Sequence, residues 1–187
     1  MIVLLGRSCS GKSTVAKEFE KLGFEKIVTY TTRPPREGEI DGIDYHFISE
    51  TKFLKMVRDG EFAETSVYRG WYYGSLIKDY YENGYSKIIV LTPKGLRMIK
   101  NNHNMKNIPN FYSVFLDVSP TETLIKSILT RSDIDECYRR YISDNGMFDG
   151  VKDEVDFVIE NFQYQYSPSN VVQIILDKIQ ERSKNKK

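Results

Sequence analysis

With 187 residues, the chain has the length of about one domain, enough to bury a core without disulfides or a structural metal. Its 27 Lys and Arg against 26 Asp and Glu give a net charge of +1, which argues against nucleic-acid binding driven by bulk charge, and 40% hydrophobic residues argue against a disordered chain. The opening apolar run, residues 2–5, is too short for a signal peptide or a membrane span. Cys9 and Cys137 form no CxxC pair, so neither a disulfide framework nor a zinc site is expected. Together these features predict a cytoplasmic, single-domain protein.

Short apolar runs alternate with amphipathic segments in the first half of the chain. Residues 2–5 have the composition of a buried strand, and apolar residues on one helical face predict a helix over 12–22 that ends at Gly23. The pattern then predicts, in chain order, a helix capped by Ser49 and closed by Gly60, strands at 62–68 and 71–73 joined by Arg69-Gly70, and a helix over 75–83.

The second half continues this alternation. It predicts, in order, a buried strand at 87–92, a helix from Pro93, a strand at 112–118, a helix that opens with the capping box Ser119-Pro120-Thr121-Glu122, a strand at 156–160, a helix over 171–179 and a frayed, charged tail at 181–187. The pattern predicts an α/β fold with three layers, in which helices cover both faces of a parallel sheet. Two polar stretches interrupt it: residues 33–75, expected to be an insertion over the carboxyl edge of the sheet, and residues 131–141.

The segment between the first expected strand and helix matches the phosphate-loop pattern G-x-x-x-x-G-K-[ST] as Gly6-Arg7-Ser8-Cys9-Ser10-Gly11-Lys12-Ser13. Small residues let successive backbone N–H groups surround the phosphates of a nucleoside triphosphate, and the helix N-terminus adds favourable potential. Lys12 is expected to reach the β and γ phosphates, and the Ser13 hydroxyl to ligate Mg²⁺. The motif predicts binding of ATP or GTP by this loop, with Thr14 as its last contact.

A second informative stretch begins at Thr29 and continues through Phe47. Arg33 and Arg36 stand beside hydroxyl side chains, and each guanidinium can bind two oxygens of a second phosphate. A solvated charged loop is the alternative interpretation of these arginines, and the phosphate loop elsewhere in the chain makes it the weaker one.

This stretch resembles the guanylate kinase family, whose signature T-T-R-x-P-R-x-G-E-x-x-G-x-D-Y-x-F corresponds to residues 31–47. Two downstream segments, Glu61-Phe62-Ala63-Glu64 and Tyr72-Tyr73-Gly74-Ser75, are similar to further elements of that family. The resemblance implies a kinase domain with a phosphate-loop core (residues 1–32, 76–130 and 141–187), an inserted nucleoside-monophosphate-binding subdomain (33–75) and a short lid (131–140). It also implies ATP-dependent phosphorylation of GMP or dGMP, with Mg²⁺, by a monomer or weak dimer.

Site residues follow from the resemblance, position by position. It implies that the GMP phosphate is held by Arg33, Arg36, Tyr45 and Tyr73, with Glu39 orienting the arginines, and that guanine lies near Thr29, Glu64, Ser75 and Thr92. It implies that Arg131 and Arg140 close onto the ATP phosphates, that Asn161 lies near the adenine, and that Lys12, Arg36, Arg131 and Arg140 carry the catalysis. The chemistry agrees for Glu64, because a carboxylate can accept hydrogen bonds from guanine N1–H and N2–H together.

The chain departs from the family pattern at several positions. Cys9 stands where the family usually has Gly, Arg7 stands where it has Pro or a small residue, and the lid is shorter. The strand that ends Asp-x-Asp in the family is Val90-Leu91-Thr92 here, so both carboxylates are missing. Two alternatives therefore stay open: a kinase for a different nucleoside monophosphate, and a non-catalytic domain that uses the same pocket only for binding.

Overall fold

Five parallel strands run through the middle of the molecule. The computed structural model describes residues 1–81, 86–106, 108, 110–130, 133–161 and 164–185. The strands lie in the order β2 (Glu25–Lys26), β7 (Lys87–Val90), β1 (Ile2–Gly6), β8 (Tyr112–Asp117) and β9 (Phe157–Glu160), and every neighbouring pair is parallel. β1 is central and buried along its whole length, as a strand covered on both faces must be, which explains its unbroken apolar sequence. The expected α/β fold with a parallel sheet is confirmed.

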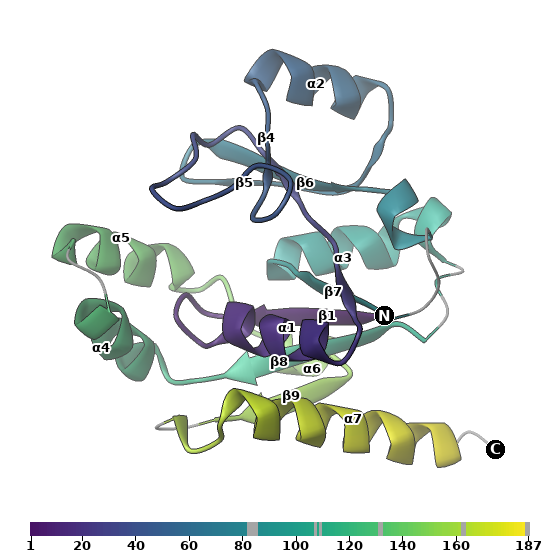
Figure 1. Ribbon diagram of the computed structural model, residues 1–187, viewed down its shortest axis with the longest axis vertical. Helices are drawn as coiled ribbons and strands as arrows, with labels where there is room; N and C mark the ends of the chain where they lie inside the picture. Colours follow the sequence, from purple (N-terminus) through teal and green to yellow (C-terminus); the bar gives the residue numbers. More distant parts are fainter. Residues whose placement is uncertain (82–85, 107, 109, 131–132, 162–163, 186–187) are drawn as a thin grey trace.

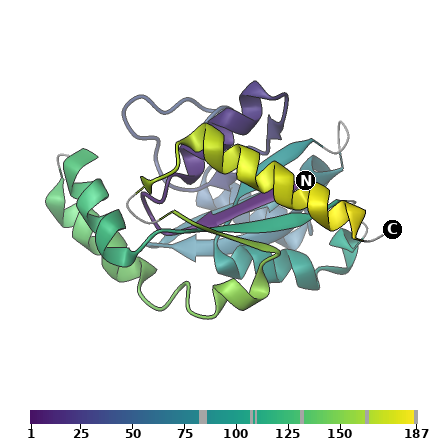
Figure 2. The same ribbon diagram turned by 90° about the horizontal axis from the view of Figure 1, so that it is seen from below.

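Helices cover both faces of this sheet (Figure 1). On one face lie α1 (Lys12–Lys21) and α7 (Pro168–Lys184), which run across the sheet in Figure 2 and fully bury Phe19 and Ile175. On the other face, α3 (Pro93–Asn101) and the short α6 (Val151–Glu154) bury Leu96 and Val151. The pair α4 (Pro120–Thr130) and α5 (Ile134–Asp144) extends from the carboxyl edge, where the phosphate loop also lies.

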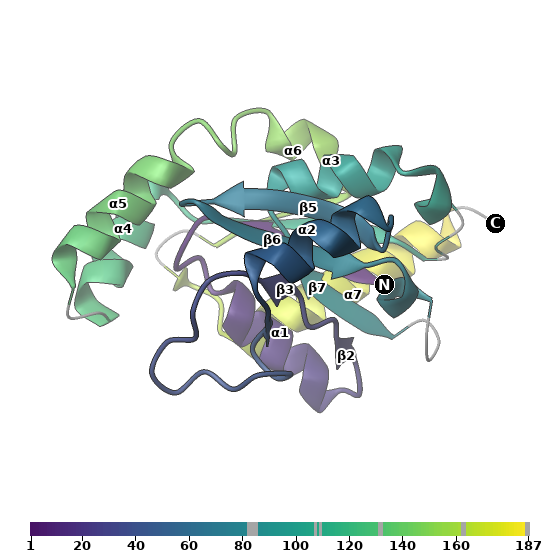
Figure 3. The same cartoon turned by 90° about the horizontal axis from the view of Figure 1, so that it is seen from above.

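A second, smaller sheet lies above that edge. Its strands are ordered β4 (His46–Phe47), β3 (Tyr30–Thr31), β6 (Trp71–Leu76) and β5 (Phe62–Tyr68), and α2 (Glu50–Arg58) packs on it through Phe53 and Met56. The β5–β6 hairpin points its turn towards α4 and α5 (Figure 3). The sheet therefore includes Tyr30–Thr31, which the sequence assigned to the core, and extends one residue beyond the expected insertion, to Leu76.

The expected helix over residues 75–83 is wrong. Ser75 pairs with Glu64 inside the β5–β6 ladder, and Leu76 packs in the small core under α2, so cross-strand pairing prevails over helical spacing. A short 3₁₀ helix, η1 (Lys78–Tyr80), follows, and residues 82–83 lie outside the described residues.

The expected fraying from residue 181 is also wrong, because α7 continues to Lys184. Arg182 pairs with Asp156 and lies over the ring of Phe157, at 5.7 Å from its centroid, and these contacts hold the last turns of the helix against β9. None of the helices in the described part of the chain combines the length and the apolar character that crossing a bilayer requires.

Candidate active site

A cavity of about 220 Å³ lies between the two sheets and beside α5. Of the residues singled out in the sequence, it is lined by Gly6, Ser8, Lys12, Thr29, Arg33, Arg36, Tyr45, Glu64, Tyr73, Thr92 and Arg140. These come from the phosphate loop, from the segments before and after β3, from both hairpin strands, from the turn between β7 and α3, and from α5. The fold therefore brings the expected donor and acceptor residues to one cavity.

The phosphate loop joins the central strand β1 to α1. Cys9 and Gly11 have left-handed backbones, with φ of 61° and 94°, and this curvature wraps the loop around its own centre. Lys12 Nζ donates to the carbonyls of Gly6 and Arg7 at 2.8 and 2.7 Å. Burial lowers the pKa of Lys12 to about 8, and the negative charge of Asp144, which acts to raise the pKa, only partly offsets this effect. Lys12 is thus a desolvated cation held at the mouth of the loop.

Other loop residues differ in their surroundings. Ser13 and Thr14 are exposed in the first turn of α1, where the backbone N–H groups have no acceptor within the helix. The Ser10 hydroxyl is buried and has no hydrogen-bond partner among the described residues. The Arg7 guanidinium lies over the Phe148 ring, 5.3 Å from its centroid, and donates to the carbonyl of Asp144 at 3.2 Å. Arg7 therefore connects the loop to the last residue of α5 and to the segment that follows it.

The two acceptor arginines are held differently. Arg33 is buried, and its Nη2 donates to both carboxylate oxygens of Glu39 at 2.8 Å, which raises the pKa of Arg33 although burial acts in the opposite direction. Its guanidinium also lies 5.4 Å from the centroid of the Tyr45 ring. Arg36 is half-exposed, and Glu39 accepts only its backbone N–H. Glu39 therefore orients the side chain of Arg33 and only the backbone of Arg36.

At the opposite end of the cavity, a β-bulge directs Glu64 towards α3. The register of the β5–β6 pair shifts between Phe62 and Glu64, so that Ala63 and Glu64 both face α3. Ser75 Oγ donates to Glu64 at 2.9 Å and is itself 2.7 Å from the Tyr80 hydroxyl. Burial raises the pKa of Glu64 to about 7, and the hydrogen bond from Ser75 only partly offsets this.

Gly95 and Thr92 complete this end of the cavity. A Cβ on Gly95 would lie 3.0 Å from a Glu64 carboxylate oxygen, so the carboxylate approaches α3 only because the residue is glycine. Thr92 lines the cavity and also caps α3, since its Oγ1 accepts from the backbone N–H of Gly95 at 3.1 Å. Ser75 is fully buried behind Glu64 and does not line the cavity, so it can reach a base only through Glu64.

The remaining expected residues lie around the donor side. The side chain of Asn161 is buried and accepts from the backbone N–H of Tyr166 at 2.9 Å, while the hydroxyl of the nearby Tyr164 donates to the carbonyl of Cys9. The segment that contains Asn161 is thereby tied to the phosphate loop, and a contact of Asn161 with adenine stays a prediction. Arg131 lies outside the described residues.

Comparison with known proteins now assigns the family. A family model described as guanylate kinase matches residues 1–175. The chain belongs to the guanylate kinase family. The guanylate kinase of Prochlorococcus marinus subsp. pastoris is 30% identical over 181 residues, which cover 94% of this chain and 96% of that protein. That of Rickettsia prowazekii is 29% identical over 191 residues, covering 99% and 93%.

Solved structures agree on the fold. The crystal structure of guanylate kinase from Anaplasma phagocytophilum matches 97% of this chain and 85% of its own, with a TM-score of 0.66 and 23% sequence identity. This guanylate kinase family member is therefore an enzyme of the nucleoside monophosphate kinase class, with the phosphate-loop fold and the use of ATP that the class implies.

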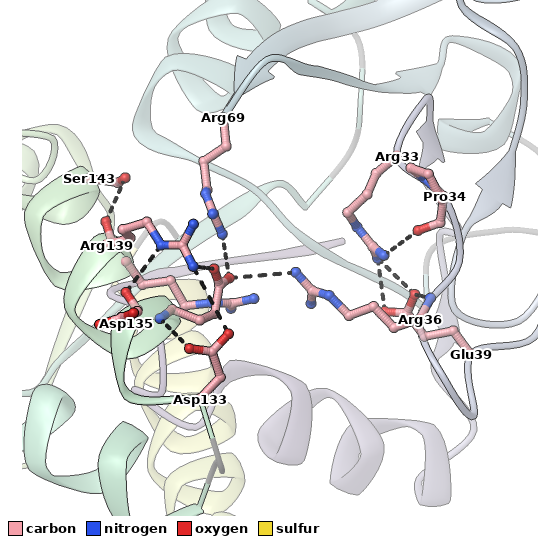
Figure 4. A network of polar contacts seen from close by, with 11 residues as sticks. Arg33, Pro34, Arg36, Glu39, Arg69, Asp133, Asp135, Arg139 and Ser143 are labelled. Carbon is pink, nitrogen blue, oxygen red and sulfur yellow. Dashed lines mark hydrogen bonds and ion pairs between the residues drawn. The ribbon is translucent and has the colours of Figure 1, made fainter.

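Several polar residues of this guanylate kinase family member were missed in the sequence. Arg69 of the hairpin turn forms an ion pair with Glu136 of α5, at the carboxylate that the dashed lines from the labelled Arg69 and Arg36 reach in Figure 4. Asp144 lines the cavity, as Lys12 does. The spacing of Glu136, Arg140 and Asp144 at intervals of four was a usable signal, because it places all three on one face of a helix. Nothing in the sequence indicated that Arg69 would reach that helix.

Proposed function

We propose that this protein transfers the γ-phosphoryl group of ATP to GMP or dGMP, bound in the cavity between the two sheets. One observation carries the proposal: a single cavity has the buried Glu64 carboxylate at one end, and Lys12 with two acceptor arginines at the other. A nucleoside monophosphate has the matching polarity, with hydrogen-bond donors on a guanine base and negative charge on its phosphate.

The donor side is suited to a triphosphate. The first-turn amides of α1 have no helical acceptor, and the buried Ser10 hydroxyl has no partner among the described residues, so the loop offers unpaired polar groups to an anion. Lys12 donates to two loop carbonyls within the described part of the chain, and it can exchange these bonds for bonds to phosphate oxygens. Mg²⁺, held by the Ser13 hydroxyl together with the ATP phosphates, would neutralise charge on the transferred group.

On the acceptor side, Arg33 is held tightly, whereas the side chain of Arg36 is half-exposed and makes a long contact with Glu136. The contact of Arg33 Nη2 with both carboxylate oxygens of Glu39, together with the ring of Tyr45, preorganises Arg33 for the phosphate of the monophosphate. Tyr73, whose ring centroid lies 6.0 Å from that of Tyr45, adds a second hydroxyl to the same wall. Arg36 can then turn onto the phosphate when it arrives, because its side chain is half-exposed.

The base is recognised by the opposite end of the cavity. Ionised Glu64 accepts from guanine N1–H and N2–H, while Ser75 and Tyr80 fix the carboxylate from behind. Thr29 and Thr92 line the same region and offer hydroxyls to the remaining base edges.

Phosphoryl transfer then requires positioning and neutralisation of charge rather than a protein base, because the attacking phosphate is already ionised at neutral pH. Arg140 lines the cavity near Lys12 and is suited to stabilise the charge that moves between the two nucleotides, and Arg131 is proposed to assist it. A monomer or weak dimer in the cytoplasm stays a prediction.

A panel of acceptors tests the proposal directly. ADP formation from ATP and Mg²⁺ is measured with GMP, dGMP, IMP, AMP, CMP and UMP, and Lys12→Met serves as the inactive control. GMP and dGMP are expected to give the highest kcat/KM. Preference for a different base would assign the enzyme to another monophosphate, and binding of GMP without turnover by any acceptor would indicate a binding domain.

A further inference from the structure

Three charged residues lie in a row along a single face of α5. Glu136, Arg140 and Asp144 are spaced four residues apart, so their side chains stand above one another along the helix. Arg140 and Asp144 line the cavity, whereas Glu136 lies at its outer edge. The face therefore has a carboxylate at each end and an arginine between them.

The carboxylate at the amino end contacts the small sheet. Glu136 Oε1 accepts from Arg69 at the β5–β6 turn and from Arg140 Nε at 2.8 Å, and Arg36 Nη2 lies 3.9 Å away (Figure 4). Its side chain is only 17% exposed. Partial burial alone would raise the pKa of Glu136, but the hydrogen bonds from Arg69 and Arg140 outweigh it and hold the pKa below its ordinary value.

Arg69 occupies a backbone conformation that disfavours its side chain. Its φ is 57°, and Gly70 follows with φ 80°, the geometry of a two-residue hairpin turn that normally selects Asn or Gly at the first position. A non-glycine residue in this region costs on the order of 1 kcal/mol. The arginine is therefore explained by what its side chain does, which is to bind a carboxylate on α5.

The carboxylate at the other end contacts the phosphate loop. Asp144 Oδ2 accepts from the backbone N–H of Ser8 at 2.6 Å, and the Asp144 carbonyl accepts from Arg7. Asp144 is only 7% exposed, so this contact is sheltered from water. The end of α5 is thus joined to the loop that surrounds the donor phosphates.

We propose that Glu136 and Asp144 are positioning residues that anchor the two ends of α5, one to Arg69 and one to the phosphate loop, so that Arg140 is held between the donor and acceptor phosphates. This inference rests on the proposed function, because it gives Arg140 its role in phosphoryl transfer. The pKa of Arg36 is lowered, mainly by its partial burial and next by the positive charge of Arg140. The two arginines therefore repel each other, and the negative charge of Glu136 compensates this repulsion before phosphates bind. When phosphates bind and take the place of Glu136 as the anionic partner of Arg36 and Arg140, the ion pair with Arg69 keeps Glu136 in position.

The amino-terminal anchor is tested with Glu136→Gln, Arg69→Asn and the matched control Asp135→Asn, which removes an exposed carboxylate from the same helix. Asn suits the left-handed turn, so Arg69→Asn removes the partner without adding backbone strain. Both test variants are expected to lower kcat about tenfold, while the Kd for ATP without acceptor changes less than about twofold. The control is expected to match the parent protein.

Double variants show whether the residues act through Arg140. Arg69→Asn should add nothing to Glu136→Gln, and neither should lower kcat further in an Arg140→Gln background, because a positioning residue has no effect once its target is absent. Independent, multiplicative losses would overturn the proposal and indicate that Arg69 and Glu136 act on the nucleotides directly.

The second anchor is tested by comparing Asp144→Ala with Asp144→Asn. Asn retains an oxygen for the Ser8 N–H, so Asp144→Asn should restore most of the kcat that Asp144→Ala loses, and equal losses in both would remove this anchor. Hydrogen exchange of residues 134–144 in the ligand-free protein provides a readout without catalysis: Glu136→Gln, Arg69→Asn and Asp144→Ala should each accelerate it roughly tenfold, and unchanged exchange would overturn the proposal. If the parent protein fails to phosphorylate GMP while the variants accelerate exchange, the proposed function fails and the anchoring stands.

Discussion

The donor part of the site (the donor end: the phosphate loop with Lys12) and the acceptor part (the acceptor end: the arginines together with the base pocket around Glu64) are built from different parts of the polypeptide. At the donor end, the groups proposed to bind the triphosphate are mainly backbone N–H groups of one continuous loop, which lies between the buried strand β1 and α1. At the acceptor end, they are side chains collected from the segment after β3, from both hairpin strands and from the start of α3. A backbone site keeps its chemistry when side chains change, whereas a side-chain site depends on the partners that fix each group.

The two ends also differ in how charge is distributed among their side chains. The donor end has one central cation, Lys12, with its pKa lowered by burial. The acceptor end balances Arg33 against Glu39 and holds Glu64 with its pKa raised by burial. Single substitutions should therefore be most damaging at Lys12 and graded among the acceptor residues.

Lys12→Met should have the largest effect, a loss of about 10²–10³ or more in kcat, because a preorganised cation on the transferred phosphoryl group is removed. Stability should not fall, since the ammonium is desolvated in the folded protein and the variant removes that cost. Steady-state kinetics and thermal melting are compared with Lys17→Met, an exposed position on the same helix. Near-normal turnover in Lys12→Met would show that the donor end does not depend on this cation.

Arg36→Ala should have the next largest effect, a decrease of about 10- to 100-fold in kcat/KM for GMP, the worth of one charge-assisted contact. ATP affinity without acceptor should not change, because the proposed function places the triphosphate in the phosphate loop, away from Arg36. Calorimetry of ATP binding checks this, with the exposed Arg58→Ala of α2 as control. A large loss of ATP affinity would place Arg36 on the donor side.

The donor end could be predicted from the sequence more completely than the acceptor end. The phosphate loop is contiguous, so its motif, its strand and its helix could all be predicted from local spacing. Among the acceptor residues, Arg33 and Arg36 could be predicted from their residue types, whereas the others were found only through a family resemblance, and the fine geometry of the group was not predicted. The bulge that directs Glu64 towards α3, and the burial of Ser75 behind it, depend on strand pairing between residues eleven positions apart.

The longest-range contacts were beyond local reasoning altogether. Arg69 and Glu136 are separated by 67 positions, and Ser8 and Asp144 by 136. Each pair depends on how α5 is placed over the carboxyl edge of the sheet, and no residue pattern encodes that placement. The helix expected at residues 75–83 was wrong for a related reason, because cross-strand pairing of Ser75 outweighed its local spacing.

We expect Glu64 to make GMP binding at the acceptor end sensitive to pH. Its pKa is about 7 and guanine requires the ionised form, so the Kd for GMP should fall about tenfold as pH rises from 6 to 8. Because this raised pKa means that the folded protein binds the proton more tightly than the unfolded chain, the stability due to Glu64 is present below its unfolded value of 4.5 and is lost as pH rises through 7. Glu64→Gln, which leaves only the titration of the GMP phosphate, should remove most of the dependence; an identical profile would exclude Glu64 from the base site.

Thr92→Asp should sharpen base selection by a smaller amount. One Asp oxygen can cap α3 as Thr92 does, and the other adds a charged acceptor to the cavity, worth about 1 kcal/mol more than a neutral one. The ratio of kcat/KM for GMP over IMP, which lacks the N2 amine, should rise several-fold. Thr92→Asn caps the helix without adding charge and should change the ratio less. Equal ratios in Thr92→Asp and the parent protein would remove residue 92 from base recognition.

Cys9→Gly should have the smallest effect, and it tests how far the donor end depends on backbone alone. Cys9 has φ 61°, a conformation that costs an L-residue roughly 1–2 kcal/mol, and glycine relieves this cost. Glycine also makes the unfolded chain more flexible, which opposes folding by about 0.4–1 kcal/mol, so the net gain should be about 0.5 kcal/mol in urea unfolding. Cys9→Ala keeps the strained backbone and removes only the thiol, so it should gain nothing. If Cys9→Ala is stabilised as much as Cys9→Gly, the thiol rather than the backbone limits stability there, and the donor end depends on its side chains more than the geometry of the loop implies.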